Sequence, residues 1–268
     1  MTSIDHSQPV SGPGMLESLR WAVHDTLVMT RRNLLRYVRL PENLMGITLQ
    51  PIMFLVLFVY VLGGAIRATT PDYITFLLPG ILVQTMVFGA MFTALGLAQD
   101  VQSGLFDRYR SLPMSRSAVI TGRLTADMLG NVLVAAIMIS VGMLMGFRFG
   151  GGVLESLAAP AVAILFALPV AGLFAGIGLL VRTVESVNVG GFMVMFPLTF
   201  VSSAFVPVET MPGSLQPVAE ANPFTKAVNT ARALALGQEA GDLWLTFAWI
   251  AVLTAIAVPL AVWAYNRT

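Results

Sequence analysis

The sequence predicts an all-α integral membrane protein with six transmembrane helices. Of its 268 residues, 56 % are hydrophobic and only 11 % are charged, and the mean hydropathy is +0.80. A soluble domain carries about 25 % charged residues, which it needs to cover its surface. A helix of about 20 residues crosses a hydrocarbon core of about 30 Å. Six apolar runs of that order occur, at 44–62, 76–98, 118–147, 157–181, 187–206 and 244–264.

Several classes of chemistry are excluded by residue counts. The net charge of +1 gives no basic field for nucleic acid, and the absence of cysteine removes disulfides, thiolate metal sites and cysteine nucleophiles. Both histidines, His6 and His24, precede the first apolar run, so neither can serve a zinc site or serine triad in the membrane. The only lysine, Lys226, follows Thr225 rather than a glycine, which excludes a P-loop. We therefore expect no catalytic residue, metal or cofactor on this chain.

Ahead of the first run the sequence predicts a disordered arm at 1–14 and an amphipathic helix at 15–40. The arm lacks the basic and apolar regions of a signal peptide. In the helix, apolar residues recur at helical spacing, namely Leu16, Leu19, Val23, Leu27, Leu34 and Val38. Five arginines are interleaved with them, namely Arg20, Arg31, Arg32, Arg36 and Arg39. This pattern is typical of a helix lying on the inner leaflet, although a soluble helix packed on a partner has the same pattern. Pro41 ends it.

Residues 41–268 are expected to form a single transmembrane domain with both termini in the cytoplasm. Six spans place both ends of the chain on one side of the membrane. Eleven of the fifteen basic residues fall on that side, and four fall on the other. Because cytoplasmic segments carry the excess of Lys and Arg, this asymmetry assigns the termini to the cytoplasm.

The cytoplasmic segment 99–113 has the pattern of a short amphipathic helix. Val101, Leu105 and Leu112 lie close to one helical face. The acidic residues Asp100 and Asp107 lie toward its start, and the basic residues Arg108 and Arg110 lie toward its end, as the helix dipole prefers. Pro113 ends the helix. An apolar edge that no lipid covers predicts a protein partner.

The outer segment 207–237 is expected to form two short helices that dip back toward the membrane. It holds four prolines, followed by an Ala-rich helical stretch at 225–236 that Gly237 closes. An ordinary exposed loop fits poorly, because it would leave six large apolar side chains in water: Val206, Val208, Met211, Leu215, Val218 and Phe224.

Ionisable residues within the predicted spans are limited to Arg123 and Asp127, which stand four apart and predict an ion pair. Since no carboxylate lies at the bilayer midplane, a proton-coupled carrier and an intramembrane hydrolase are both disfavoured. Along the fifth run, small and polar residues share one face: Asn188, Gly191, Met195, Thr199 and Ser202. Two interpretations of this face stay open, a packing interface and a substrate-facing wall.

For the substrate-facing alternative, the sequence offers further groups on the first two runs. Phe54 and Phe58 are one helical turn apart and could form an adaptable aromatic wall. Gln84 adds a polar group on the second run. The predicted substrate path therefore consists of Phe54, Phe58, Gln84, Asn188, Met195, Thr199 and Ser202.

Two stretches, 78–119 and 205–225, resemble the permease subunits of type-2 ABC exporters, particularly the daunorubicin-resistance permease group of actinobacteria. The specific motif is Gly-Leu-Phe-Asp-Arg-Tyr-Arg-Ser-Leu-Pro after the second run. The resemblance implies that segment 99–113 is a coupling helix that docks on a cytosolic ABC ATPase dimer, which holds the ATP and Mg. Its coupling residues would be Asp100, Gly104, Leu105, Phe106, Asp107, Arg108, Arg110, Leu112 and Pro113. At the position of Asp100 many relatives carry Glu.

The resemblance also implies a second permease subunit, identical or related, in a bacterial cell membrane. We therefore expect a permease that moves an amphiphilic drug or lipid-like substrate out of the cytoplasm or inner leaflet, with membrane lipids as further partners and no nucleic acid. The alternatives are an exporter permease for a glycan or polymer, a membrane-embedded lipid-modifying enzyme and an ion-coupled carrier. Missing midplane carboxylates and histidines count against the last two.

Overall fold

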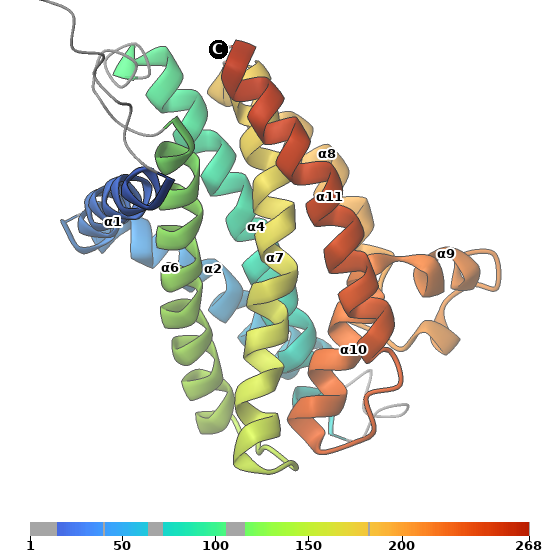
Figure 1. The fold of residues 1–268 in the computed structure, drawn as a ribbon. Helices are drawn as coiled ribbons and strands as arrows, with labels where there is room; N and C mark the ends of the chain where they lie inside the picture. Colours follow the sequence, from blue (N-terminus) through green and yellow to red (C-terminus); the bar gives the residue numbers. More distant parts are fainter. Residues whose placement is uncertain (1–14, 40, 64–71, 106–115, 182, 268) are drawn as a thin grey trace, which may run out of the picture.

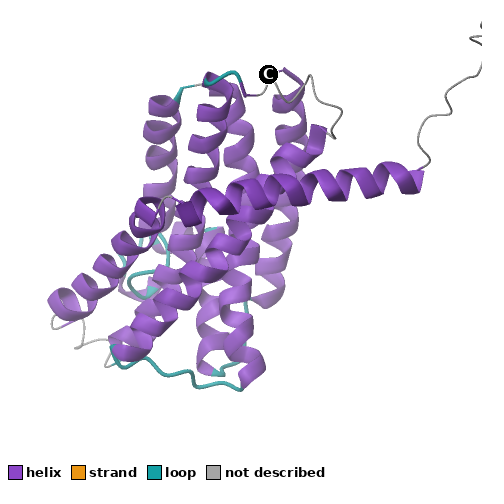
Figure 2. Ribbon diagram, turned by 90° about the vertical axis from the view of Figure 1, so that its left-hand side faces the viewer, coloured by secondary structure: helices purple, strands orange, loops and turns teal. Residues whose placement is uncertain are grey.

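A computed structural model describes residues 15–39, 41–63, 72–105, 116–181 and 183–267. These residues are almost all helical, and they contain no strand (Figures 1 and 2). The elements are α1 (Met15–Arg39), α2 (Pro41–Leu57), the π-helical η1 (Phe58–Leu62), α4 (Tyr73–Gln102), α6 (Arg116–Leu144), α7 (Val153–Val181), α8 (Val184–Phe200), the 3-10 turn η2 (Val208–Thr210), α9 (Gln216–Ala221), α10 (Pro223–Leu236) and α11 (Leu243–Arg267).

Each of the six predicted apolar runs lies largely in a helix. In the described residues, four helices are long and apolar enough to cross a membrane, namely α4, α6, α7 and α11. The first and fifth runs form shorter apolar helices, at Thr48–Val61 and Val184–Phe200. The chain is therefore an all-helical, multi-pass membrane protein.

The helix of the fifth run ends six residues before the run does. The side-chain amide of Asn222 donates to the backbone oxygens of Leu198 and Val201, at 2.6 Å each, and so satisfies carbonyls at the C-terminal end of α8. The same Asn222 side chain accepts a hydrogen bond from Phe224 N and caps the start of α10. Pro223 in the first turn of α10 and Gly237 at φ 66° after its last residue fix its two ends.

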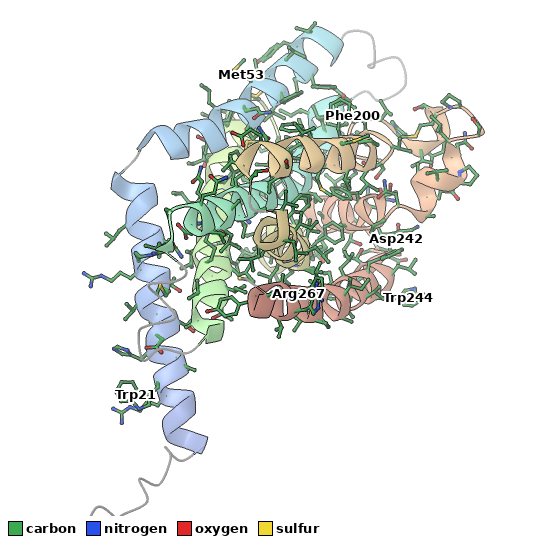
Figure 3. All side chains as sticks on the ribbon, turned by 90° about the horizontal axis from the view of Figure 1, so that it is seen from above. Trp21, Met53, Phe200, Asp242, Trp244 and Arg267 are labelled. Atoms are coloured by element: carbon green, nitrogen blue, oxygen red, sulfur yellow. The ribbon has the colours of Figure 1, made fainter. Side chains whose placement is uncertain are left out.

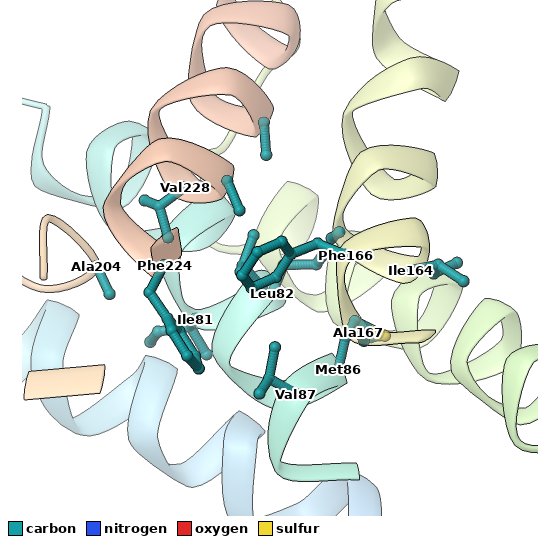
Figure 4. Close-up of a cluster of buried hydrophobic side chains, with 14 of the residues drawn as sticks. Ile81, Leu82, Met86, Val87, Ile164, Phe166, Ala167, Ala204, Phe224 and Val228 are labelled. Atoms are coloured by element: carbon teal, nitrogen blue, oxygen red, sulfur yellow. The ribbon is translucent and has the colours of Figure 1, made fainter. Parts of the chain in front are cut away.

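The core is the contact between α4 and α7, which lie at the centre of the bundle when it is seen from above (Figure 3). Phe166 of α7 meets Phe224 of α10 edge to face at 5.6 Å, beside Leu82 and Met86 of α4 (Figure 4). Helices α2 and α8 lie on one side of this pair, and α6 and α11 lie on the other. The molecule therefore has two broad outer faces.

Helix α1 runs across the bundle rather than along it (Figure 2). It packs on α6 where Gly122 leaves room, since a Cβ there would lie 2.5 Å from the Cβ of Met29. The Thr30 hydroxyl donates to the Gly122 carbonyl at 3.3 Å. Trp21, Val23 and Leu27 remain exposed on α1. The segment before the first apolar run is thus a single helix, α1.

Candidate functional site

A groove lies between α2, α4 and α8 and contains about 830 Å³ of free space, part of it open to the outside. Fifteen residues line it: Gln50, Pro51 and Phe54 from α2; Ile81, Gln84, Thr85, Phe88, Gly89, Met91, Phe92 and Leu95 from α4; and Asn188, Phe192, Phe196 and Phe200 from α8. We call it the aromatic groove. The four lining residues of α8 are spaced four apart in the sequence, so their side chains lie on one helical face.

The phenylalanines of the aromatic groove continue into a stacked series of rings. Phe196 and Phe200 stack with their centroids 4.2 Å apart, and Phe200 stacks on Phe205 at 4.8 Å. Phe205 stacks on Phe58 at 4.9 Å, and Phe58 stacks on Phe54 at 6.0 Å. The rings thus join α8, the segment after it and the α2–η1 helix into one stacked series, in which Phe205 is buried.

Three amide side chains interrupt this apolar lining, namely Gln50, Gln84 and Asn188. The Thr85 hydroxyl in the same groove is satisfied by the carbonyl of Ile81 at 2.7 Å. Gln50 and Asn188 are exposed, and Gln84 is half-buried. The three amides therefore present donors and acceptors that a ligand with hydrogen-bonding groups can use.

The structure places the predicted path residues in two different environments. Phe54, Gln84 and Asn188 line the aromatic groove, and Phe58 lies beside it in the ring series. Met195, Thr199 and Ser202 instead face the interior, with at most 5 % of their surface exposed. The hydroxyls of Thr199 and Ser202 donate to the carbonyls of Met195 and Thr199. For these three residues the structure favours the packing interpretation.

Sequence patterns did not indicate five phenylalanines that line the groove: Phe88, Phe92, Phe192, Phe196 and Phe200. The spacing of residues along the fifth run could have indicated the rings on α8, because two different helical faces can be traced from Asn188. Spacing of three and four leads to Met195 and Thr199, whereas strict spacing of four leads to Phe192, Phe196 and Phe200. The side chains on the second face are larger, and this is the face that lines the groove.

Only the first part of the predicted coupling segment falls in the described residues. The segment from Gln99 to Gln102 is the last turn of α4, continuous with the second span, and Gly104 at φ 70° follows. Asp100 is buried and pairs with Arg32 of α1 at 3.5 Å, so it ties α1 to the end of α4. Leu105 packs on a small apolar cluster that includes Met29 and Leu97. The remaining predicted coupling residues lie outside the described residues: Phe106, Asp107, Arg108, Arg110, Leu112 and Pro113.

The predicted intramembrane ion pair is confirmed. Arg123 Nε lies 3.5 Å from Asp127 Oδ2, and the Thr93 hydroxyl donates to the same carboxylate oxygen. Arg123 Nη2 donates to the Phe92 carbonyl at 3.0 Å, and its guanidinium lies where a Cβ on Gly96 would be. These contacts give the pair a structural role between α6 and α4.

A second polar cluster joins α10 to the ends of α4 and α8. Arg232 donates to the carbonyls of Phe76 and Ser203, at 3.0 and 2.7 Å, and its guanidinium lies 3.6 Å from the Phe76 ring centre. Burial lowers the pKa of Arg232 to about 9, which leaves it charged at neutral pH. Nearby, Lys226 pairs with Asp242 at 3.1 Å. In the described residues, no group of three His, Cys, Asp or Glu could hold a metal ion.

Comparison with known proteins gives a consistent result. Residues 24–236 match the family described as ABC-2 type transporter. The chain is 35 % identical to the daunorubicin resistance ABC transporter permease protein DrrB1 of Streptomyces coeruleorubidus, over 99 % of this chain and 96 % of the relative. It is 28 % identical to a doxorubicin resistance ABC transporter permease protein, DrrC, of Mycobacterium tuberculosis, over 97 % of this chain and 94 % of the relative.

Proposed function

The chain belongs to the ABC-2 type transporter family, and on this premise we propose that it exports an amphiphilic aromatic molecule that binds in the aromatic groove. It is one permease half of an ATP-driven exporter in a bacterial cell membrane. The single observation that carries the proposal is the aromatic groove itself, which phenylalanine rings and three amide side chains line between apolar helices.

The chemistry of the aromatic groove fits such a cargo. Phenylalanine faces stack on planar rings and accept varied shapes, while the amides of Gln50, Gln84 and Asn188 would bind the polar edge of the molecule. Two relatives are named for resistance to daunorubicin and doxorubicin, which supports a drug-like cargo here. A glycan is less compatible, because the groove offers few polar groups to a hydroxyl-rich chain.

The proposed topology has six spans: α2 with η1, α4, α6, α7, α8 and α11. Its support is the eleven-to-four distribution of basic residues, which puts both termini in the cytoplasm. The orientation of α1 across the bundle suits a helix lying in the inner interface, and its exposed Trp21, Val23 and Leu27 suit burial among lipid tails (Figure 2). The outer segment 207–237, with α9 and α10, then caps the opposite end.

The proposed motor is a separate ABC ATPase dimer that binds ATP and Mg and docks at segment 99–113. A movement of this segment caused by the ATPase would be transmitted to α1 through the Asp100–Arg32 pair, because this pair joins the end of α4 to α1. Helix α4 also supplies eight of the groove-lining residues. Movement of α4 by the ATPase would therefore reach the groove directly. A second permease chain, placed against the open side of the groove, would complete the path.

The test is transport by the permease and its ATPase partner in proteoliposomes, with a fluorescent anthracycline as cargo. Phe192→Ala removes a groove ring, whereas Met193→Ala truncates the adjacent side chain, which is 78 % exposed and lies outside the groove. Loss of an aromatic contact is expected to weaken apparent cargo affinity about two- to tenfold for Phe192→Ala. Met193→Ala should match the wild type. Equal transport by both variants would exclude the groove from the path.

A further inference from the structure

We propose that a second groove, between α6, α7 and α11, binds one acyl chain of an inner-leaflet phospholipid. This groove contains about 1450 Å³ of free space, part of it open to the outside. It lies on the face that α6 and α11 form, opposite the α2 and α8 side that carries the aromatic groove (Figures 1 and 3). We call it the lipid groove.

The lining of the lipid groove suits hydrocarbon. Small residues form its floor, namely Pro169 and Gly172 of α7 and Ala257 and Ala261 of α11. Two of the three threonine hydroxyls on its walls, those of Thr125 and Thr254, donate within their own helices. Thr125 donates to the Thr121 carbonyl at 2.8 Å, and Thr254 donates to the Ile250 carbonyl at 2.6 Å. Because these hydroxyls are satisfied, the groove offers apolar contacts and no free hydrogen-bonding group from either threonine.

The depth of the lipid groove matches one leaflet. On α11 its lining runs from Thr254 to Tyr265. At about 1.5 Å per residue this distance is about 17 Å, close to half of a hydrocarbon core of about 30 Å. The site therefore accommodates a single chain lying parallel to the helices, and it does not reach through the bilayer.

Two features mark the head-group level at one end of the lipid groove. Helix α1 crosses α6 there, with the hydroxyls of Thr26 and Thr121 3.2 Å apart. Arg267, the last residue of α11, stacks over Trp263 at 4.3 Å, and both side chains are exposed. Arginine and tryptophan are enriched where the hydrocarbon meets the head groups, and arginine attracts phosphate. In the topology of the proposed function, on which this assignment of leaflet rests, that end is cytoplasmic.

A lipid chain is a better occupant of this groove than a second copy of the protein. The lipid groove faces away from the aromatic groove, and two copies that share one cargo path must meet on the aromatic side. Most residues of α6 and α11 are unburied along their spans, as expected for helices at a lipid boundary. A groove between two such helices is filled by hydrocarbon from the surrounding leaflet.

The test uses the permease in vesicles of phosphatidylglycerol and phosphatidylcholine that contain a phospholipid with a diazirine midway along one acyl chain. After irradiation, labelled peptides are mapped by mass spectrometry. Val258→Trp fills the lipid groove, whereas Ile256→Trp adds the same ring at a residue equally exposed, 54 % against 56 %, outside it. Val258→Trp should reduce label on α6, α7 and α11 about tenfold, the change expected when about two methylene groups lose their contacts. Ile256→Trp should not reduce it.

A second pair of variants covers the case in which Val258→Trp fails to fold. Thr125→Trp fills the groove from α6, and Leu129→Trp is its control on the same helix, exposed but outside the groove. Label spread evenly over outward-facing residues, or equal label in filled and control variants, would overturn the proposal. Label displaced by the transported drug would make the groove a cargo site and overturn it too. Because no ATPase is present, failure of the proposed export would leave the labelling result intact.

Discussion

At the scale of single residues, neighbours on α8 have opposite roles. Met195 is 5 % exposed and packs in the core, whereas Phe196 is 52 % exposed and lines the aromatic groove. A helix advances about 100° per residue, so consecutive side chains can lie on different faces. Composition does not separate them, because both side chains are large and apolar. Their substitution therefore distinguishes a packing position from a cargo position.

We predict that Met195→Trp impairs folding and that Phe196→Trp impairs transport. A larger ring at Met195 overpacks a filled interior at a cost of about 1–3 kcal/mol, which should lower the melting temperature and the yield of monodisperse protein in detergent. Phe196→Trp should assemble normally, because its ring borders open space, yet change the apparent affinity for cargo. Thermal unfolding and proteoliposome transport measure the two effects. A stable Met195→Trp protein with altered transport would reverse the assignment of the two faces.

At the scale of elements, hydropathy predicted where the helices lie but not which side of each faces the protein. The six apolar runs, the helix before them, the Arg123–Asp127 pair and α10 with its Gly237 end were all readable from local pattern. Helix α8 turns its small and polar side, with Met195 and Thr199, to the core and its phenylalanines to the groove, so polarity did not identify the groove face. Its end at Phe200 depends on Asn222, more than twenty residues away in sequence, and local pattern cannot supply such a contact.

The close approach of α4 and α7 gives a prediction at this scale. A Cβ on Gly178 would lie 2.6 Å from the backbone oxygen of Ala94 and 2.9 Å from its Cα, so neither helix can yield without moving its backbone. Gly178→Ala should therefore lower the melting temperature, with a loss of about 1–3 kcal/mol. Gly190→Ala on α8 is the control, because nothing lies within 4 Å of its added Cβ. If Gly190→Ala were the more damaging, the α4–α7 packing described here would be contradicted.

At the scale of the whole molecule, the topology is the first quantity to measure. The basic-residue asymmetry predicts that tags before Met15 and after Thr268 report the cytoplasm, and that a tag at Gly213 reports the outside. Gly213 is exposed and has open space around it, so it accepts an insertion. Reporter fusions active only in the cytoplasm or only outside give the assignment. Termini on opposite sides would reject the six-span arrangement.

The last prediction concerns which face pairs with a second permease. Met53 on α2 lies on the same side of the bundle as Phe200, far from Arg267 and Trp244 on α11 (Figure 3). The chain has no cysteine, so single cysteines give clean crosslinks. If two copies enclose the cargo path with their aromatic grooves, Met53→Cys, at an exposed residue on this side, should form crosslinked dimers with a short bismaleimide in membranes. Ile256→Cys, exposed on α11, should stay monomeric. Crosslinking at Ile256 alone would place the interface on the α6–α11 face, and it would remove both the shared path and the lipid groove.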